Sequence, residues 1–179
     1  MRRRVAALVA GTLFLVGCGG GDDMTRFEQD GIAFSHPSGW ERMQDVESDD
    51  EGDGLVVALE GDSGVEGATV RALAFNQPRE PGTVGQYGKS AADTRPTQAN
   101  GQLVEDGEYD VPGAEGAWRV VVDYRIEPEG GGDLVPARIV DILPVEGDRQ
   151  YRLTISGPRE AVDSEEIAKV IDSFEVVSE

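Results

Sequence analysis

The chain has 179 residues, a length that suits one compact domain. It carries 35 acidic and 16 basic residues, for a net charge of −19 at pH 7. This charge argues against nucleic-acid binding, which needs Lys and Arg to replace the phosphate counterions. It also argues against lying flat on an anionic membrane. Because there is a single cysteine, we expect a folded domain without an internal disulfide.

The N-terminal segment has the layout of a bacterial lipoprotein signal. Three arginines at residues 2–4 precede an apolar run over residues 5–16, and Gly17 stands directly before Cys18. The run is too short to span a bilayer, which requires about 20 apolar residues in a helix. Residues 15–18, LVGC, fit a lipobox, so we expect cleavage before Cys18 and lipidation of its thiol. The alternative is an ordinary cleaved signal whose cysteine is incidental.

This signal also predicts the domain organisation and the location. We expect a signal peptide at residues 1–17, a lipidated flexible tether at residues 18–24, and one α+β domain at residues 25–179. Acylation adds two or three chains, which are enough for stable anchoring. The predicted location is therefore the extracytoplasmic face of the cell membrane. Whether this is the inner or the outer membrane stays open.

The first part of the domain alternates short apolar strands with turns. Phe27, then Ile32 and Phe34, predict two strands around the turn residues Asp30 and Gly31. The next predicted elements are a turn at residues 36–40 closed by Trp40, an acidic loop at 44–54, a buried strand at 55–59, a turn at 61–67 and a strand at 68–75.

A helix follows, with clear start and stop signals. Thr83 and Gln86 have the spacing of a capping box, and Pro96 is expected to close the segment. One face of this helix consists of small and apolar residues at 3.6-residue spacing, which would let it lie close to a sheet. These residues are Val84, Tyr87, Gly88, Ala91 and Ala92.

The second half predicts an antiparallel meander after a short strand near residues 103–111. Residues 118–126 alternate, which favours one core face and a mostly solvated face with Arg119, Val121, Asp123 and Arg125. A glycine-rich loop at 129–133 leads to a strand at 135–143. The next strand, at 151–155, is expected to place Arg152 and Thr154 outside.

The chain ends with a second helix. Asp163 and Glu166 are interpreted as an acidic capping box at its start. An i, i+3, i+4, i+7 stripe follows, the pattern of a helix docked on a sheet, formed by Ile167, Val170, Ile171 and Phe174. Residues 174–177 predict a last strand. The expected fold class is α+β, an antiparallel sheet flanked by two or more helices.

Two stretches resemble PsbP-like domains. Residues 31–40, GIAFSHPSGW, are similar to their opening hairpin, an apolar strand that runs into P-x-G-W. The strand at residues 151–155 and a helix that finishes at residues 171–174 are similar to their ending. With the lipobox, the chain resembles the LpqN-type lipoproteins of actinobacteria. The resemblance implies an antiparallel sheet flanked by helices and a non-catalytic accessory or binding role, with structural positions at Pro37, Gly39 and Trp40.

Few residues point to catalysis or to a cofactor. His36 is the only histidine, and because it precedes Pro37 in a turn we expect a partly exposed loop residue rather than a catalytic base. Zinc sites need several His or Cys ligands, which the chain lacks. Neither a phosphate-binding loop nor a dinucleotide-binding motif is present. We therefore expect no catalytic residue, no metal and no cofactor.

One acidic stretch leaves calcium binding open. Five residues match positions 1, 3, 5, 6 and 12 of an EF-hand-like loop, namely Asp49, Glu51, Asp53, Gly54 and Glu60. Position 3 is Glu rather than Asp or Asn, and residues 55–59 are predicted to form a strand instead of an exiting helix. We interpret this stretch as a solvated hairpin loop, with calcium as the alternative.

The leading functional hypothesis is a lipid-anchored accessory or binding module of the cell envelope. Its partners are the membrane, through Cys18, and an envelope protein or an amphiphilic small molecule, and we expect a monomer without catalysis. One alternative is an envelope hydrolase that uses unrecognised carboxylates, since 35 acids form pairs by chance. Another is a passive surface lipoprotein. Trp40 and Trp118 are interpreted first as core residues and only second as ligand contacts.

Overall fold

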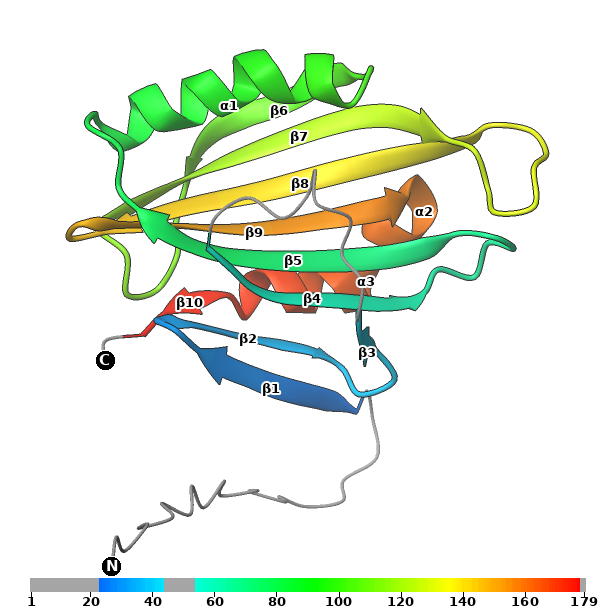
Figure 1. Cartoon of the computed structure of the whole chain (residues 1–179), viewed down its shortest axis with the longest axis horizontal. Helices are drawn as coiled ribbons and strands as arrows, with labels where there is room; N and C mark the ends of the chain where they lie inside the picture. The colour runs from blue at the N-terminus through cyan, green and yellow to red at the C-terminus, as the bar shows by residue number, and fades with distance from the viewer. Residues whose placement is uncertain (1–22, 44–53, 178–179) are drawn as a thin grey trace, which may run out of the picture.

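The computed structural model describes residues 23–43 and 54–177, which fold into two antiparallel sheets and three helices. This arrangement confirms the predicted α+β class (Figure 1). The elements are β1 (Met24–Gln29), β2 (Ile32–Pro37), β3 (Glu41–Arg42), β4 (Leu55–Asp62), β5 (Thr69–Pro78), α1 (Val84–Gln98), β6 (Gln102–Tyr109), β7 (Gly116–Ile126), β8 (Val135–Glu146), β9 (Arg149–Pro158), α2 (Arg159–Val162), α3 (Glu165–Asp172) and β10 (Glu175–Val176).

The larger sheet has seven strands in the order β3-β4-β5-β9-β8-β7-β6. The β6–β7, β7–β8 and β8–β9 neighbours are consecutive in the chain, as the meander predicts. The smaller sheet has the order β1-β2-β10. Its β1–β2 hairpin turns at Asp30 and Gly31, whose φ angles of 49° and 79° suit a two-residue hairpin. The first predicted turn is therefore confirmed.

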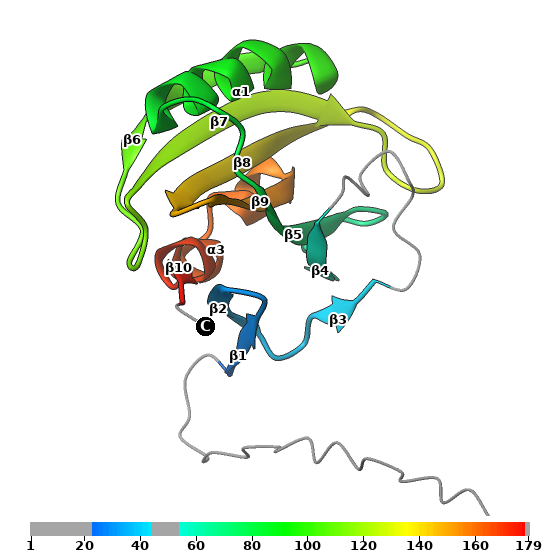
Figure 2. The same ribbon diagram turned by 60° about the vertical axis from the view of Figure 1, so that its left-hand side comes forward.

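The helices cover opposite faces of the seven-stranded sheet. Figures 1 and 2 show α1 over β6, β7 and β8, whereas α3 and the smaller sheet lie against the other face. The main core lies on that second face and includes Phe34, Ile142, Leu153 and Phe174. A smaller apolar cluster lies beneath α1. The sheet is thus the middle layer of the domain.

Helix α1 begins as predicted but ends later. Both hydrogen bonds of the Thr83–Gln86 capping box are formed. Pro96 lies inside the last turn, and the helix continues to Gln98. The end is a Schellman motif, in which Asn100 adopts a φ of 48° and the Gly101 amide donates to the Pro96 carbonyl at 2.8 Å. The prediction that Pro96 ends the helix is wrong. The proline removes one helical hydrogen bond, but the bonds of the residues that follow it close the last turn.

One residue on the face of β7 that was predicted to be mostly solvated belongs to the core, whereas Arg119, Asp123 and Arg125 on that face are partly or fully exposed. Val121 is only 2% exposed and packs in the main core, while Val120 and Val122 pack under α1 on the other face. Both faces of β7 are covered, so alternation cannot distinguish them. Thr154 of β9, predicted to point outward, is also buried because it bonds to a neighbouring strand.

Helix α3 presents the predicted apolar stripe but uses a different cap. Ile167, Val170 and Ile171 are buried, and Phe174 follows at 1% exposure. The N-cap is Ser164, whose hydroxyl accepts from the amide of Ile167 at 3.3 Å. The predicted N-cap, Asp163, instead forms ion pairs with Arg138 and Arg159. That pairing leaves the serine to satisfy the first turn.

Candidate functional site

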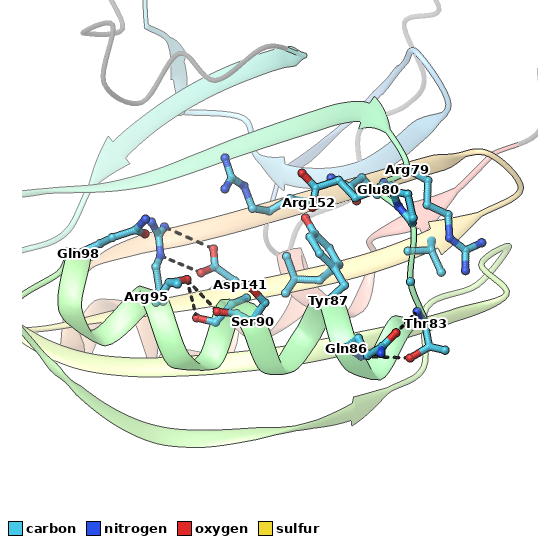
Figure 3. A pocket seen from close by; sticks show the side chains of 17 residues that line it. Arg79, Glu80, Thr83, Gln86, Tyr87, Ser90, Arg95, Gln98, Asp141 and Arg152 are labelled. Carbon is cyan, nitrogen blue, oxygen red and sulfur yellow. Dashed lines mark hydrogen bonds and ion pairs between the residues drawn. The ribbon is translucent and has the colours of Figure 1, made fainter.

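A groove of about 350 Å³ runs between α1 and the strands β8 and β9 (Figure 3). The segment that links β5 to α1 contributes Arg79 and Glu80 to its wall. We take this groove as the candidate site because side chains from three elements meet around a buried carboxylate. On the helix side it is lined by Thr83, Gln86, Tyr87, Ser90, Ala91, Thr94, Arg95 and Gln98, and on the sheet side by Asp141, Leu143, Val145, Gln150 and Arg152.

The buried carboxylate is that of Asp141, which is 3% exposed on β8. Its Oδ2 lies 2.8 Å from Nε of Arg95, which reaches across from α1 (Figure 3). Its Oδ1 accepts from the hydroxyl of Thr154 on β9 at 2.5 Å and from the Arg95 guanidinium at 3.4 Å. The buried charge of Asp141 therefore has a counter-charge in Arg95. The same contacts tie α1 to the sheet.

Tyr87 projects from α1 into the middle of the groove (Figure 3). Burial raises the pKa of its hydroxyl. The positive charge of Arg152 lowers this pKa, whereas the negative charges of Asp141 and Glu80 raise it further. The phenol is therefore protonated at neutral pH and can donate a hydrogen bond.

Arg152 forms part of the opposite wall, on β9. Its guanidinium carbon lies 3.9 Å from the centre of the Phe75 ring on the neighbouring strand β5, and the two residues are paired in register. Stacking uses the face of a guanidinium, whereas hydrogen bonds to carboxylates and phosphates use its edge. The Phe75 ring thus fixes the plane of the Arg152 guanidinium.

The other end of the groove is organised by Arg79. Its Nη1 donates to Oε2 of Glu115 and to the carbonyl of Gly147, both at 3.0 Å. Nearby, the amide of Glu80 donates to the side-chain carbonyl of Gln150 at 3.3 Å. These bonds fix the segment between β5 and α1 against the β8–β9 turn. The floor of the groove is apolar and consists of Leu143 and Val145 of β8.

A close approach of helix and sheet holds the groove in shape. Gly88 of α1 lies directly against the ring of Trp118 on β7, and a Cβ at this glycine would meet Cγ of that ring at 2.0 Å. Beside it, Ala92 packs on Val120 and Val122. The small residues predicted for this helix face therefore have the expected role. Trp118 is confirmed as a packing residue.

His36 is far from this groove. It lies in β2, on the other face of the seven-stranded sheet, and is 8% exposed. Its ring stacks on Trp40 at 6.3 Å, and its Nδ1 lies 2.9 Å from the Pro37 carbonyl. The expectation of a partly exposed loop residue is wrong, because the strand extends through Pro37 and the aromatic side chains enclose the imidazole. Trp40 is a core residue, as predicted.

The other residues singled out in the sequence fall at or outside the edge of the described structure. Cys18 lies outside it, as do the first three residues of the calcium-like match, Asp49, Glu51 and Asp53. Glu60, the last position of the calcium-like match, lies in the extended strand β4. At about 3.3 Å per residue, this strand carries it roughly 20 Å away from Gly54. In an EF-hand the loop instead turns sharply at this glycine, so that the residue at position 12 reaches the ion held by positions 1, 3 and 5.

Two further findings concern the described residues alone. Within residues 23–43 and 54–177, no group of three or more His, Cys, Asp or Glu side chains is placed to hold a metal ion. No helix in this part of the chain is long and apolar enough to cross a membrane.

Sequence reasoning did not identify the groove. Arg95, Asp141 and Arg152 belong to different elements and come together only through the order of the strands. One signal was available, since Asp141 is the single charge within the apolar run of residues 139–143. A lone carboxylate in a buried strand requires a partner.

Comparison with known proteins identifies the fold. No protein-family model and no curated protein sequence matches the chain. Among solved structures, the chain is similar to CyanoP, the PsbP protein of Synechocystis sp. PCC 6803, with a TM-score of 0.57 and 18% identity over 90% of this chain and 98% of that one. It is also similar to LpqN of Mycobacterium tuberculosis, described as involved in cell envelope biogenesis, with a TM-score of 0.50 and 10% identity over 87% and 91%. The fold is therefore PsbP-like, as the sequence motifs predicted.

Proposed function

We propose that this protein is a lipoprotein of the LpqN type, anchored through Cys18 to the extracytoplasmic face of the cell membrane, that binds an amphiphilic small molecule in the groove beneath α1. It acts as a monomeric accessory module of the envelope and catalyses no reaction. An envelope protein is the other candidate partner.

The sequence around Cys18 supports the location. A basic start, a short apolar run and a small residue before the cysteine are what lipoprotein processing requires. The structural likeness to LpqN, a protein of envelope biogenesis, agrees with this location. The acidic surface suits a domain held off an anionic membrane by its tether.

The groove is the observation that carries the binding role. It combines an apolar floor at Leu143 and Val145 with hydrogen-bonding side chains along α1. A pocket with both kinds of wall suits a molecule that has a polar and an apolar part. The helix that covers the groove is fixed by a buried ion pair and a close glycine contact, so the walls are preformed.

The chemistry of the groove supports binding without catalysis. Its buried acid, Asp141, is engaged by Arg95 and Thr154 through both oxygens. The second acid among its described lining residues is Glu80, which lies in the segment between β5 and α1. The histidine lies on the opposite face of the sheet.

The anchor is tested in the native host by membrane fractionation. The wild-type chain is expected in the membrane pellet, and Cys18→Ala is expected in the soluble extracytoplasmic fraction. Identical fractionation of the two chains would refute lipidation at this residue. Extraction with high salt serves as a control, because it releases proteins that are held by charge alone.

Binding is tested by extracting the small molecules that copurify with the chain and measuring them by mass spectrometry. Ala91→Trp fills the groove and should remove the copurifying amphiphile, whereas Gln29→Trp on the exposed edge of β1 should retain it. Equal amounts on both variants would place the ligand elsewhere. Turnover that is lost in Asp141→Asn while folding stays intact would favour the hydrolase instead.

A further inference from the structure

An apolar recess lies at the end of the seven-stranded sheet where the β4–β5 turn and the β7–β8 loop meet (Figures 1 and 2). This corner recess has a volume of about 420 Å³, and its apolar wall consists of Val65, Val135, Pro136 and Pro158. Leu134, the residue just before this wall, is 52% exposed. A single exposed apolar side chain is common on any protein surface, but one beside an apolar recess indicates a surface for interaction.

A second cavity, of about 620 Å³, adjoins the corner recess and shares Val65 with it. The wall of this acidic cavity carries four exposed acids and one base, namely Asp62, Glu66, Glu127, Glu129 and Arg71. In the part of the chain that the structure describes, no ion pair engages any of the four acids. The cavity therefore has a negative field that attracts a cation.

A contact between the two turns fixes both cavities. The amide of Glu129 in the β7–β8 loop donates to the carbonyl of Gly67 in the β4–β5 turn at 2.6 Å. Gly67 has a φ of 73°, and a Cβ at this position would meet the carbonyl oxygen of Glu129 at 2.5 Å, so the close approach requires glycine. The walls are held in one arrangement before a partner arrives, which reduces the entropic cost of binding.

The two neighbouring cavities define the chemistry of one occupant. An apolar side chain fits the corner recess, and a Lys or Arg close to it in the same segment reaches the acidic cavity. A second copy of this chain is a poor candidate, because each copy carries a net charge of −19. An anionic membrane is repelled for the same reason. A segment of another protein that is both basic and apolar complements the charge and the shape of this surface.

We propose that the corner recess and the acidic cavity together bind a short segment of a partner protein in which an apolar side chain is flanked by Lys or Arg. This surface shares no lining residue with the α1 groove. The inference therefore goes beyond the proposed function and does not depend on an amphiphile in that groove.

Selection from a phage-displayed library of random octapeptides tests the chemistry of the occupant. The mature chain carrying Cys18→Ala retains every described residue and serves as the bait. We expect the enriched peptides to place an aliphatic or aromatic residue next to Lys or Arg. No enrichment over the starting library, or enrichment of acidic peptides, would overturn the proposal.

Matched apolar variants locate the binding surface, with fluorescence anisotropy of the most enriched peptide as the measurement. Val65→Ser removes the side chain that the two cavities share, while the backbone hydrogen bonds of this residue remain. It should weaken the peptide about tenfold. Val104→Ser, on the edge strand β6, removes a valine that is 52% exposed and should leave the affinity unchanged. Leu134→Ser serves if Val65→Ser fails to fold, and unchanged affinity in both recess variants would refute the assignment.

Matched charge variants separate a defined site from general attraction to an acidic protein. Glu127→Gln combined with Glu129→Gln should weaken the peptide about fivefold and reduce the salt dependence of its affinity. Asp106→Asn combined with Glu108→Gln removes the same charge from exposed positions of β6 and should have little effect. Equal effects of the two double variants would show that only the net charge attracts the peptide and would overturn the site.

A groove variant distinguishes this surface from the one in the proposed function. Ala91→Trp, which fills the α1 groove, should bind the selected peptides with unchanged affinity. Loss of peptide binding in this variant would place the peptides in the α1 groove and would overturn the corner site. Loss of the copurifying amphiphile alone would leave it intact.

Discussion

Replacing Gly88 with alanine should destabilise the protein, although alanine is the better helix former. In an exposed helix interior, this change gains about 0.5–1 kcal/mol. Here the new Cβ would lie 2.0 Å from Cγ of Trp118 and 2.4 Å from its Cδ1. Ordinary contacts of a Cβ begin at about 3.4 Å, so α1 must move away from the sheet by more than an ångström.

The size of the effect follows from the rigidity of the partner. The clash is with the inner part of the indole ring, close to the backbone of β7, so Trp118 cannot rotate its far end away. Overpacking in a core costs typically about 1–3 kcal/mol. The upper overpacking cost is about 3 kcal/mol, and the gain in helix propensity offsets about 1 kcal/mol of it. Gly88→Ala should therefore lower the unfolding free energy by about 2 kcal/mol. For a chain of this size, the melting temperature should fall by about 4–8 °C.

Gly85 provides the matched control. It lies in the same helix, and its added Cβ would meet Cζ3 of Trp118 at 3.6 Å, an ordinary contact. Gly85→Ala should therefore stabilise the protein by about 0.5 kcal/mol. Urea unfolding followed by circular dichroism measures both variants, and Gly88→Ala should become harmless when combined with Trp118→Leu. If Gly88→Ala were as stable as Gly85→Ala, the packing of α1 described here would be wrong.

Three further predictions concern polar groups. Arg95→Met should cost about 3–5 kcal/mol in urea unfolding because it leaves Asp141 buried without a counter-charge, and adding Asp141→Asn should recover most of this loss; no recovery would contradict the pairing. The hydrogen bond from Arg138 lowers the pKa of Asp123, so their pair stabilises the fold above the unfolded pKa of about 3.9 and this contribution is lost as the pH falls through the folded pKa. The stability difference between wild type and Arg138→Gln should therefore be constant above about pH 6 and shrink below about pH 4, and a difference that grows in acid would refute this. Burial raises the pKa of Tyr87, so Tyr87→Phe should remove a tyrosine that ionises above about pH 10 from the ultraviolet titration; loss of an earlier step would contradict its burial.

Elements encoded by short-range patterns were predictable from the sequence. The Thr83–Gln86 capping box is a local hydrogen-bond pair, and it forms. The turn at Asp30 and Gly31 likewise depends only on which residues tolerate a positive φ. The apolar stripe of α3 also needs no knowledge of its partner, because its period alone indicates a buried face.

Features that depend on a second layer were not predictable. Alternation along the strand predicts that Val121 lies on the solvated face. It is buried because the sheet is covered on both sides. Thr154 and His36 were predicted to be exposed. Thr154 is buried against the carboxylate of Asp141, and His36 is buried among aromatic side chains. The groove has the same origin, since its charged residues lie in α1, β8 and β9 and meet only after the strands are ordered.

The anchored state of the chain can be measured most directly by intact mass spectrometry of the protein purified from native membranes. We predict a mature chain that begins at Cys18 and carries the added mass of a diacylglyceryl group, with or without a third acyl chain. A chain that begins at Met1, or one with an unmodified thiol, would contradict it.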